Sequence, residues 1–353
     1  MAGGELLWYY RGGLTSMFAN VNRGKRSVLL DLQSEQGLEA ARALCARADV
    51  VLENFRPGVT ERLGIGPDDL HALNPRLVYC RISGYGQTGP WSERRSYDPV
   101  VQGLSGFAAI QKNPEVPIPD LVRNALVDKA ASYTAAQAVT AALLARERGE
   151  EGQTIEVSLL DAGLAFLWPD GMMKHTFQGD GVREGPALYD RYRLTETADG
   201  HVVMWAGMDN EWHAVFRGLG RPDLIEDERL ATGRARAQHG EELAKIVYAE
   251  FKKYTTAEIV ARMEQADAPC GPLLELDEVP DHPQVRHNET VYETEHSTAG
   301  PLRQCRPAPR FSGTPLERGP VAPLLGEHTD EVLAETGYSP EQIAAMREAG
   351  AIR

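Results

Sequence analysis

Residues 121–168, LVRNALVDKAASYTAAQAVTAALLARERGEEGQTIEVSLLDAGLAFLW, decide how the rest of the chain is interpreted. From Ala125 to Arg148 this stretch is rich in alanine, has few β-branched residues and contains no glycine or proline, which predicts a helix. Its middle, from Ala135 to Ala145, is nearly all apolar. That pattern is typical of a helix buried on most of its surface rather than of an amphipathic surface helix.

Two carboxylates lie at the starts of two helices predicted in this stretch. Gly149 and Gly152 end the first helix, TIEVSLL (154–160) predicts a short strand, and a second apolar helix begins near Asp161. Asp128 lies at the start of the first helix. Because a helix N-terminus stabilises negative charge by up to about 2 kcal/mol, we expect both groups to stay ionised, as a nucleophile or base must. The structural alternative is that both are helix caps.

The sequence before this stretch predicts a parallel sheet. SVLLDL (27–32), DVVLENF (49–55) and NPRLVYCRIS (74–83) have the composition of strands. A helix capped by Ser34 lies between the first two strands, and a short helix lies between the last two. Alternating strands and helices with short connections indicate an α/β fold with a doubly wound parallel sheet.

The third predicted strand is followed by a glycine loop, GYGQTGP (84–90). Its glycines match the spacing G-x-G-x-x-G, but Pro90 and a polar run occupy the place where a dinucleotide-binding helix should begin. We therefore expect a tight loop at the carboxyl end of a strand, suited to a ligand, and no dinucleotide fingerprint.

The second half of the chain has a different pattern. LYDRYRLTETADGHVVMWAG (188–207) predicts a hairpin with an Asp-Gly turn, and helical segments follow at 210–219, 239–252 and 256–266. We expect a smaller α+β domain over 189–294. An irregular return segment is expected over 295–320, and two final helices capped by Thr329 and Ser339.

Composition excludes several classes of function. With 42% hydrophobic and 25% charged residues the chain is typical of soluble globular proteins, and it has neither an apolar run of 18 residues nor a signal peptide, so we expect a cytoplasmic protein without a membrane segment. The four cysteines form no C-x-x-C, and no H-E-x-x-H occurs, so neither a disulfide framework nor a metal site is indicated. A net charge of −14 argues against nucleic acid as a partner.

Charge is unevenly distributed along the chain. Residues 1–95 hold 12 Lys or Arg and 10 Asp or Glu, a balance of +2, so the remainder carries −16. A locally basic segment in an acidic protein suits a small anionic ligand such as a nucleotide cofactor, although chance would explain it equally well.

Six blocks in fixed order resemble the family III CoA-transferases, the group that includes formyl-CoA transferase, carnitine CoA-transferase and α-methylacyl-CoA racemase. The resemblance covers roughly residues 18–353, and its blocks are ANVNRGKRSVLLDL (19–32), VVLENFRPGVTERLGIG (50–66), LNPRLVYCRISGYGQTGP (73–90), GEEGQTIEVSLLDA (149–162), PCGPLLELDEVPDHPQV (269–285) and APLLGEHTDEVLAETGY (322–338).

The resemblance implies a catalytic role for Asp128 and a binding site for coenzyme A. The family's nucleophilic aspartate matches Asp128, which would attack an acyl-CoA thioester, form an acyl-aspartyl anhydride and then an aspartyl-CoA thioester, and pass CoA to a carboxylic acid without a metal. The family's CoA-binding positions match Leu30, Gln33, Asn54, Phe55, Arg56, Arg62, Arg95 and Tyr97. The alternatives are that each arginine is a solvated surface charge and that Phe55 belongs to the core.

A second enzymatic hypothesis is an acyl-CoA racemase or epimerase. That branch resembles a two-base enzyme with a histidine immediately before the aspartate that matches Asp128, and an aspartate that matches Asp161. Here the preceding residue is Val127, which carries no proton, so we favour transfer over racemisation. Lys129 is no substitute, because one step along a helix turns a side chain by about 100°. For Asp161 we favour the role of a helix cap.

The resemblance also implies an architecture. We expect a large Rossmann-like domain formed by 1–188 and 295–353, the small domain over 189–294, and an interlocked homodimer. The family's usual N-terminal strand–helix–strand unit has no counterpart in this sequence, so a third hypothesis is a truncated chain that binds CoA weakly and has no activity. GDGVREG (179–185) matches the glycine-rich lid of formyl-CoA transferase poorly, which argues against formate and oxalate as substrates.

Overall fold

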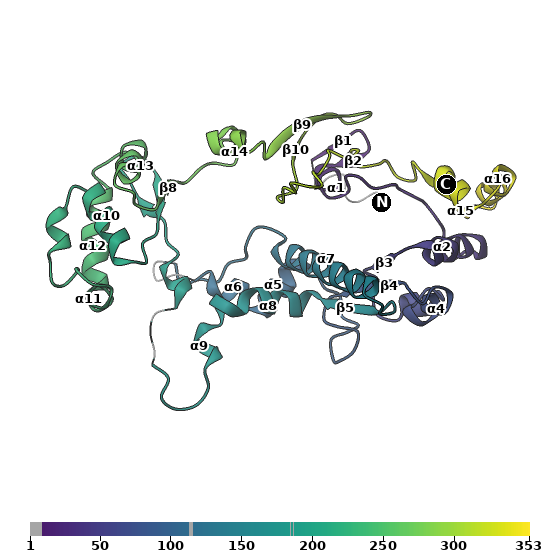
Figure 1. Cartoon of the computed structure of the whole chain (residues 1–353), viewed down its shortest axis with the longest axis horizontal. Coiled ribbons are helices and arrows are strands. Elements are labelled where there is room, and N and C mark those ends of the chain that lie inside the picture. The colour runs from purple at the N-terminus through teal and green to yellow at the C-terminus, as the bar shows by residue number, and fades with distance from the viewer. Residues whose placement is uncertain (1–8, 113–115, 184, 186) are drawn as a thin grey trace. The chain divides into compact units, whose positions relative to one another are not determined.

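The computed structural model describes residues 9–112, 116–183, 185 and 187–353. The chain forms two compact units (Figure 1): unit 1 is Met1–Tyr189 with Tyr292–Arg353, and unit 2 is Asp190–Val291. Both helices and strands occur in each unit, so the chain has the mixed α/β composition expected. The domain boundaries drawn from the sequence stay a prediction, because compactness alone does not show that a unit folds independently.

The centre of unit 1 is a parallel sheet of three strands in the order β3 (Val50–Glu53), β4 (Val78–Ser83) and β5 (Thr154–Ser158). All but one residue of the central strand β4 are buried. Neighbouring side chains of β4 point to opposite faces: Tyr79 packs with Leu70 and Leu77, whereas Cys80 packs with α7. Both faces are thus covered, as parallel sheets require.

The strand expected over 27–32 is not part of this sheet. Leu30 makes an isolated bridge to Ile352, and the Asp31 N–H donates to the carbonyl of Ala351 at 2.8 Å. The apolar side chains explain the difference, because Leu30 packs with the C-terminal cluster that includes Leu333 and Ile352. The prediction of a strand here was wrong, since apolar composition does not specify the partner of an extended segment.

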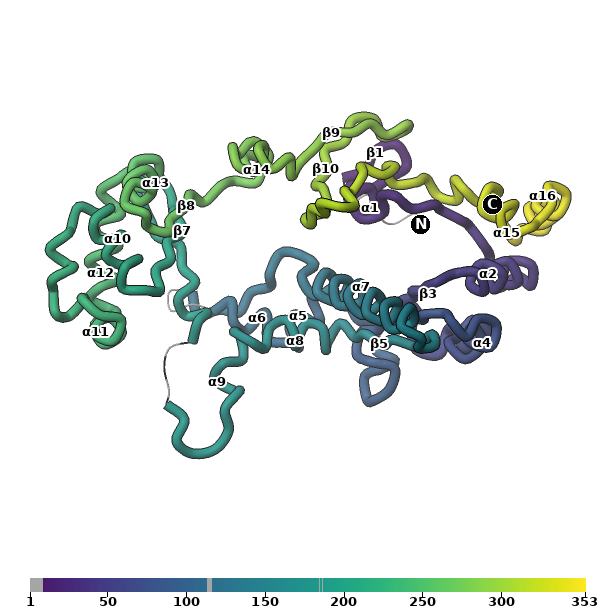
Figure 2. Tube along the Cα trace, in the orientation of Figure 1, coloured from purple at the N-terminus to yellow at the C-terminus, as the bar shows by residue number. Residues whose placement is uncertain are grey.

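Three helices pack around the edge of the sheet that bears β5. Helix α7 (Leu126–Glu147) contacts β4, β5 and α8 (Leu159–Gly171), and α5 (Asp98–Ser105) contacts both α7 and α8, as the trace in Figure 2 shows. The sequence predicted α7 as buried on most of its surface, but Tyr133 is 78% and Leu144 is 51% exposed. Only one face of α7 lies on the sheet, so that prediction was wrong for the isolated chain.

Unit 2 is a small antiparallel sheet with helices around one core. The predicted hairpin is confirmed: β6 (Thr195–Glu196) pairs with β7 (His201–Met204), which pairs with β8 (Cys270–Pro272). The predicted helices are α10 (Asp209–Gly218), α12 (Gly240–Phe251) and α13 (Thr256–Gln265), and they enclose Phe216, Phe251, Ile259 and Met263.

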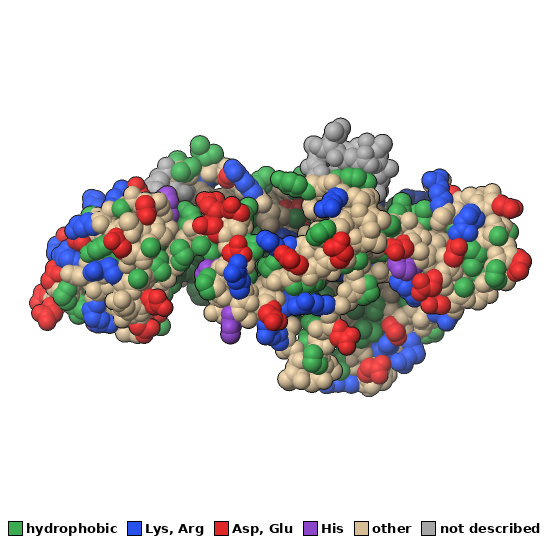
Figure 3. Space-filling view, turned by 90° about the horizontal axis from the view of Figure 1, so that it is seen from above, with side chains coloured by type: hydrophobic (Ala, Val, Ile, Leu, Met, Phe, Trp, Pro, Cys, Tyr) green, Lys and Arg blue, Asp and Glu red, His purple; other side chains and the backbone are tan. Residues whose placement is uncertain are grey.

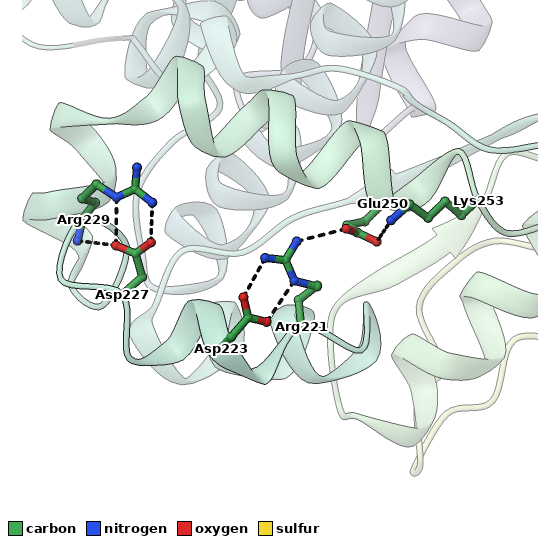
Figure 4. A network of polar contacts seen from close by, with 6 residues as sticks. All are labelled: Arg221, Asp223, Asp227, Arg229, Glu250 and Lys253. Carbon is green, nitrogen blue, oxygen red and sulfur yellow. Dashed lines mark hydrogen bonds and ion pairs between the residues drawn. The ribbon is translucent and has the colours of Figure 1, made fainter.

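Charged side chains link the surface of unit 2. Arg221 pairs with Asp223 at 2.6 Å and with Glu250 at 3.0 Å, and Lys253 reaches the other oxygen of Glu250 at 2.7 Å (Figure 4). A separate pair joins Arg229 to Asp227. Exposed pairs such as Arg221 with Asp223 contribute about 0–1 kcal/mol each. Glu250 is itself buried, and its two cationic partners balance its charge.

The C-terminal return to unit 1 is more ordered than expected. The segment predicted as irregular over 295–320 contains most of a hairpin of β9 (Val291–His296) and β10 (Gly300–Cys305), and β10 begins after the turn with Gly300 at a φ of +70°. Thr329 is the first residue of α15 (Thr329–Thr336) rather than its cap, a position that His328 occupies. Ser339 caps α16 (Pro340–Glu348) as predicted.

The remaining elements are short, apart from α2, whose first turn is capped by Ser34 as predicted. None of the helices in the described part of the chain is long and apolar enough to cross a membrane. The remaining helices and strands are β1 (Tyr10–Arg11), β2 (Leu14–Thr15), α1 (Ser16–Val21), α2 (Glu35–Arg47), α3 (Val59–Arg62), α4 (Pro67–Leu73), α6 (Phe107–Ile110), α9 (Met173–Thr176), α11 (Gly233–Gln238) and α14 (Pro283–His287).

Candidate active site

The start of α7 is capped by a residue from another helix. Its N-cap position is Ala125, which has no side-chain acceptor for the free N–H groups of the first turn. Asp98, the first residue of α5, supplies one: its Oδ2 accepts from the N–H of Val127 at 2.7 Å and from the N–H of Asp128 at 3.0 Å. The geometry of Asp128 therefore depends on the packing of α5 against α7.

Asp98 is itself held in place. Asp98 is only 6% exposed, and its Oδ1 accepts from Nε2 of Gln102 at 2.6 Å. Gln102 is 1% exposed and also bonds the backbone of Val122 and Asn124, which lead into α7. All three partners of the Asp98 carboxylate are donors, so the pattern suits an acceptor-only group.

The carboxylate of Asp128 has no hydrogen-bond or ion-pair partner among the described residues. Only its backbone is engaged, since its carbonyl accepts from Ser132 Oγ at 2.8 Å. The side chain keeps contact with solvent, yet partial burial raises its pKa, and the negative charge of Asp98 raises that pKa further. Burial and the like charge of Asp98 thus act against the ionisation that the helix N-terminus favours, and the expectation that Asp128 stays ionised remains a prediction.

Asp161 occupies the same position of α8 but is engaged. Ser158 caps α8 by accepting from the N–H of Asp161 at 2.9 Å, and its hydroxyl is 2.7 Å from Asp161 Oδ2. The N-cap of α8 is therefore Ser158 and not Asp161, so the expectation of Asp161 as a helix cap was wrong: its carboxylate lies in the first turn and binds the hydroxyl of the cap residue.

The residues before and after Asp128, Val127 and Lys129, have different surroundings from the Asp128 carboxylate. Val127 is fully buried among Val101, Phe107 and Leu167, where it contributes to packing. The Lys129 ammonium donates to Asn124 Oδ1. The residue that precedes Asp128 therefore faces the core, and the residue that follows it is tied to the segment before α7.

The positions predicted to bind CoA lie in three segments. Phe55 is 45% and Tyr97 is 72% exposed, so the alternative of Phe55 as a core residue was wrong. Asn54 and Gln33 are exposed, and Leu30 is partly buried. Arg56, Arg62 and Arg95 are exposed, and no ion pair or hydrogen bond to their side chains occurs within the described ranges. Unpaired arginines beside exposed aromatic rings fit a ligand that carries phosphates and a planar base.

A family model described as CoA-transferase family III matches residues 6–329. The chain belongs to CoA-transferase family III.

Curated relatives within this family catalyse two kinds of reaction. A succinyl-CoA:glutarate CoA-transferase of Mus musculus is 34% identical over 323 residues, which cover 91% of this chain and 74% of the relative. An α-methylacyl-CoA racemase of Mus musculus is 35% identical over 334 residues, covering 92% and 84%. The crystal structure of Rv3272 from Mycobacterium tuberculosis superposes with a TM-score of 0.77 at 32% identity, covering 88% of this chain and 81% of that one.

A partly buried ion cluster, missed in the sequence, supports one of the segments predicted to bind CoA in this family III CoA-transferase. Arg81 on β4 pairs with Glu61 at 2.7 Å and lies 3.6 Å from Glu53 on β3. Burial raises the pKa of Glu53, although the N–H of Phe55 and the charge of Arg81 oppose that effect. Because Glu53 Oε2 accepts from the Phe55 N–H at 2.6 Å, the cluster holds the turn that carries Asn54 and Arg56.

Both missed features left a trace in the sequence of the CoA-transferase. Glu53 and Arg81 are opposite each other in the register of β3 and β4, so a correct strand alignment would have paired them. For Asp98 the trace is indirect: a long helix that starts at Ala-Leu-Val lacks a cap of its own, so a remote group must supply one. In the part of the chain that the structure describes, no group of three or more His, Cys, Asp or Glu side chains is placed to hold a metal ion.

Proposed function

We propose that this chain transfers CoA from an acyl-CoA to a free carboxylic acid, with Asp128 as the nucleophile. One observation carries the proposal. Of the two aspartates at the third position of an apolar helix, Asp161 is bound to its cap, whereas the Asp128 carboxylate meets no donor among the described residues. A nucleophile needs lone pairs that are not committed to donors, and only Asp128 meets that requirement.

In the proposed reaction, an oxygen of Asp128 attacks the thioester carbon, the C–S bond breaks, and CoA leaves as the thiolate. The product is an acyl-aspartyl anhydride. The thiolate then attacks the aspartyl carbonyl, which releases the donor acid and forms an aspartyl-CoA thioester. An acceptor carboxylate reverses the two steps. No water enters, so the free energy of the thioester is conserved as long as the site excludes hydrolysis.

The start of α7 limits how the oxyanions of these steps are stabilised. The N–H groups of Val127 and Asp128 already donate to Asp98. They are therefore unavailable to a tetrahedral oxyanion, and the donors that catalysis of this kind requires must come from other groups.

We propose that CoA is bound by the segments that carry Asn54 to Arg62, Arg95 and Tyr97, together with Leu30 and Gln33. The arginines suit the phosphates, because guanidinium groups bind phosphate oxygens in pairs of hydrogen bonds. The exposed rings of Phe55 and Tyr97 suit stacking on adenine. The relatives' substrates indicate where to start: succinyl-CoA is the first donor to test, and dicarboxylic acids are the first acceptors.

Racemisation of an acyl-CoA is the alternative function, and the similarity to the mouse racemase favours it. Val127 argues against it, since its fully buried, apolar side chain cannot exchange a proton. The two functions differ in a direct test: a racemase incorporates deuterium from solvent at the α-carbon of its substrate without any second acid, and a transferase needs that acid.

We propose a Rossmann-like topology for unit 1 and an interlocked homodimer, in the cytoplasm. Large apolar side chains on the open faces of α7 and α8 support the dimer: Tyr133, Leu144, Phe166 and Trp168 are 44–78% exposed in the single chain. Figure 3 shows hydrophobic side chains interspersed with charged ones on the face drawn. Light scattering coupled to size-exclusion chromatography measures the oligomeric state, and a monomer at micromolar concentration would contradict the proposed homodimer.

The experiment that tests the proposed function is intact-mass spectrometry after incubation with a panel of acyl-CoAs and a quench with hydroxylamine, which converts an activated aspartyl group into a stable hydroxamate. We expect modification of Asp128, abolished in Asp128→Ala and retained in the matched variant Asp161→Ala. CoA binding without modification would contradict the aspartyl intermediate. The absence of CoA binding would favour a chain without activity.

Binding by the arginines is tested separately from the chemistry. Arg56→Ala, Arg62→Ala and Arg95→Ala should raise KM for acyl-CoA with little change in kcat, because they remove uniform binding. Arg217→Ala is the matched control, since Arg217 is exposed on α10 in unit 2. An equal effect of all four substitutions on KM would show that the arginines act only through the overall charge of the protein and do not contact CoA.

A further inference from the structure

We infer that Asp98 is a positioning residue for Asp128: it closes the first turn of α7 from a neighbouring helix and thereby aims the carboxylate that reacts. The inference concerns Asp98 and Gln102, and it rests on the proposed function for its effect on rate.

The geometry assigns Asp98 two tasks with one side chain. Its Oδ2 holds the N–H groups of the second and third residues of α7, Val127 and Asp128, and the third is the proposed nucleophile itself. A side-chain acceptor at these two amides is what defines a helix cap. Here the cap lies 30 residues before Asp128, so it transmits the position of α5 directly to the backbone of the nucleophile.

A second contact fixes the cap itself. Gln102 lies one turn after Asp98 on α5, and its amide donates to Asp98 Oδ1 while it also binds the carbonyl of Asn124 at 2.9 Å. Gln102 therefore holds both the segment that leads into α7 and Asp98, the residue that caps it. Because Asp98 and Gln102 are both buried, their rotamers are constrained, and the start of α7 has little freedom to move.

The charge of Asp98 acts on the same group. Three charged side chains belong to the helices that meet at this helix start: Asp98 of α5 contacts the N–H of Asp128, Lys129 of α7 is bound to Asn124, and Asp161 of α8 is bound to Ser158. Of these carboxylates, Asp98 contributes to the raised pKa of Asp128. A carboxylate with a raised pKa is a stronger nucleophile once it is ionised, so the cap that aims Asp128 also adjusts its reactivity.

The test uses the full chain and the variant Asp98→Asn. An asparagine oxygen can accept from the backbone amides, but its NH₂ group then meets the NH₂ of Gln102, so one contact is lost together with the charge. We expect acylation of Asp128 to slow about 100-fold, as for other small misplacements of reacting groups, with KM for acyl-CoA unchanged. Ser158→Ala is the matched control, because it removes the cap of α8, and it should change neither quantity.

A second readout does not depend on catalysis. Carbodiimide with an amine labels protonated carboxyl groups, so the labelling of Asp128, followed by peptide mass spectrometry, falls as the pH rises through its pKa. In Asp98→Asn the midpoint should shift to lower pH, because a neighbouring negative charge is gone. A residue that is only structural would leave the midpoint where it is in the wild type.

The outcomes separate the two proposals. Wild-type acylation rate and midpoint in folded Asp98→Asn overturn the inference and leave the proposed function intact. A shifted midpoint without any acyl adduct in the wild type supports the link between Asp98 and Asp128 and contradicts the proposed function. If Asp98→Asn does not fold, Asp98→Glu decides: it keeps the charge, so a wild-type midpoint with slower acylation supports the inference, and a wild-type rate overturns it.

Discussion

The starts of α7 and α8 place the same residue at the same helical position and give it opposite surroundings. Asp128 and Asp161 are each the third residue of an apolar helix. At α8 the cap comes from three residues earlier, and Ser158 engages both the backbone and the carboxylate of Asp161. At α7 the cap is remote, and Asp98 engages the backbone alone. A borrowed cap leaves the carboxylate of its helix free for chemistry, whereas a local cap consumes it.

The largest expected effect separates the two aspartates by activity. Asp128→Asn should lower the rate of CoA transfer by about 10⁴-fold or more, the scale seen when an enzyme loses its nucleophile. Asp161→Asn should stay within a few-fold of the wild type, since its carboxylate is bound to the hydroxyl of the cap residue Ser158. Both rates are measured by release of free CoA from the donor in the presence of the acceptor acid. Equal losses in the two variants would show that the comparison does not extend to function.

The next prediction concerns the residue before Asp128. Val127→His should lower the free energy of unfolding by about 2 kcal/mol, because an imidazole without a partner replaces a fully buried valine. It should not introduce α-proton exchange, since position 127 faces the core. Chemical denaturation measures the first effect, and deuterium incorporation into a 2-methylacyl-CoA measures the second. Exchange in this variant would revive the racemase hypothesis. Val127→Ile, which stays apolar, is the control.

Removal of the local cap should affect stability alone. Ser158→Ala deletes the acceptor for the Asp161 N–H and should cost about 1 kcal/mol of the free energy of unfolding. The rate of transfer should be unchanged, because the start of α7 is capped independently. A loss of activity comparable with that of Asp98→Asn would indicate that both helix starts belong to one catalytic unit.

The smallest effect is a dependence of stability on pH. Because the folded state raises the pKa of Asp128, this group stabilises the protein only while it is protonated, and that contribution is lost as the pH rises through the folded-state pKa. Asp128→Asn mimics the protonated form, so its Tm should exceed that of the wild type at neutral pH. The gain should disappear below about pH 3.9, the ordinary pKa of aspartate, where the group is neutral in both states.

The sequence predicted the elements around the site better than their connections. Alanine content and the following glycines located α7 to within a residue or two, and the caps Ser34 and Ser339 were predicted correctly from local sequence. Contacts between distant residues left no such mark. Asp98 is the first residue of α5, and only the packing of α5 shows that Asp98 also caps α7.

The same limit explains the errors. The run over 27–32 has strand composition, but its partners are residues near the C-terminus. The apolar middle of α7 was read as a buried helix, although a single chain covers one face of it. The effect of Asp98 on the pKa of Asp128 could not be predicted, because a helix dipole can be inferred from position alone, whereas a neighbouring charge depends on the fold.

The borrowed cap also sets an order of assembly. During synthesis Asp98 leaves the ribosome before α7 exists, and the first turn of α7 closes on it only after α5 has docked. A chain that has formed its helices but not yet packed them contains the aspartate without the helix start that aims it. On the proposed function, we expect such a chain not to react with acyl-CoA until α5 and α7 have packed together.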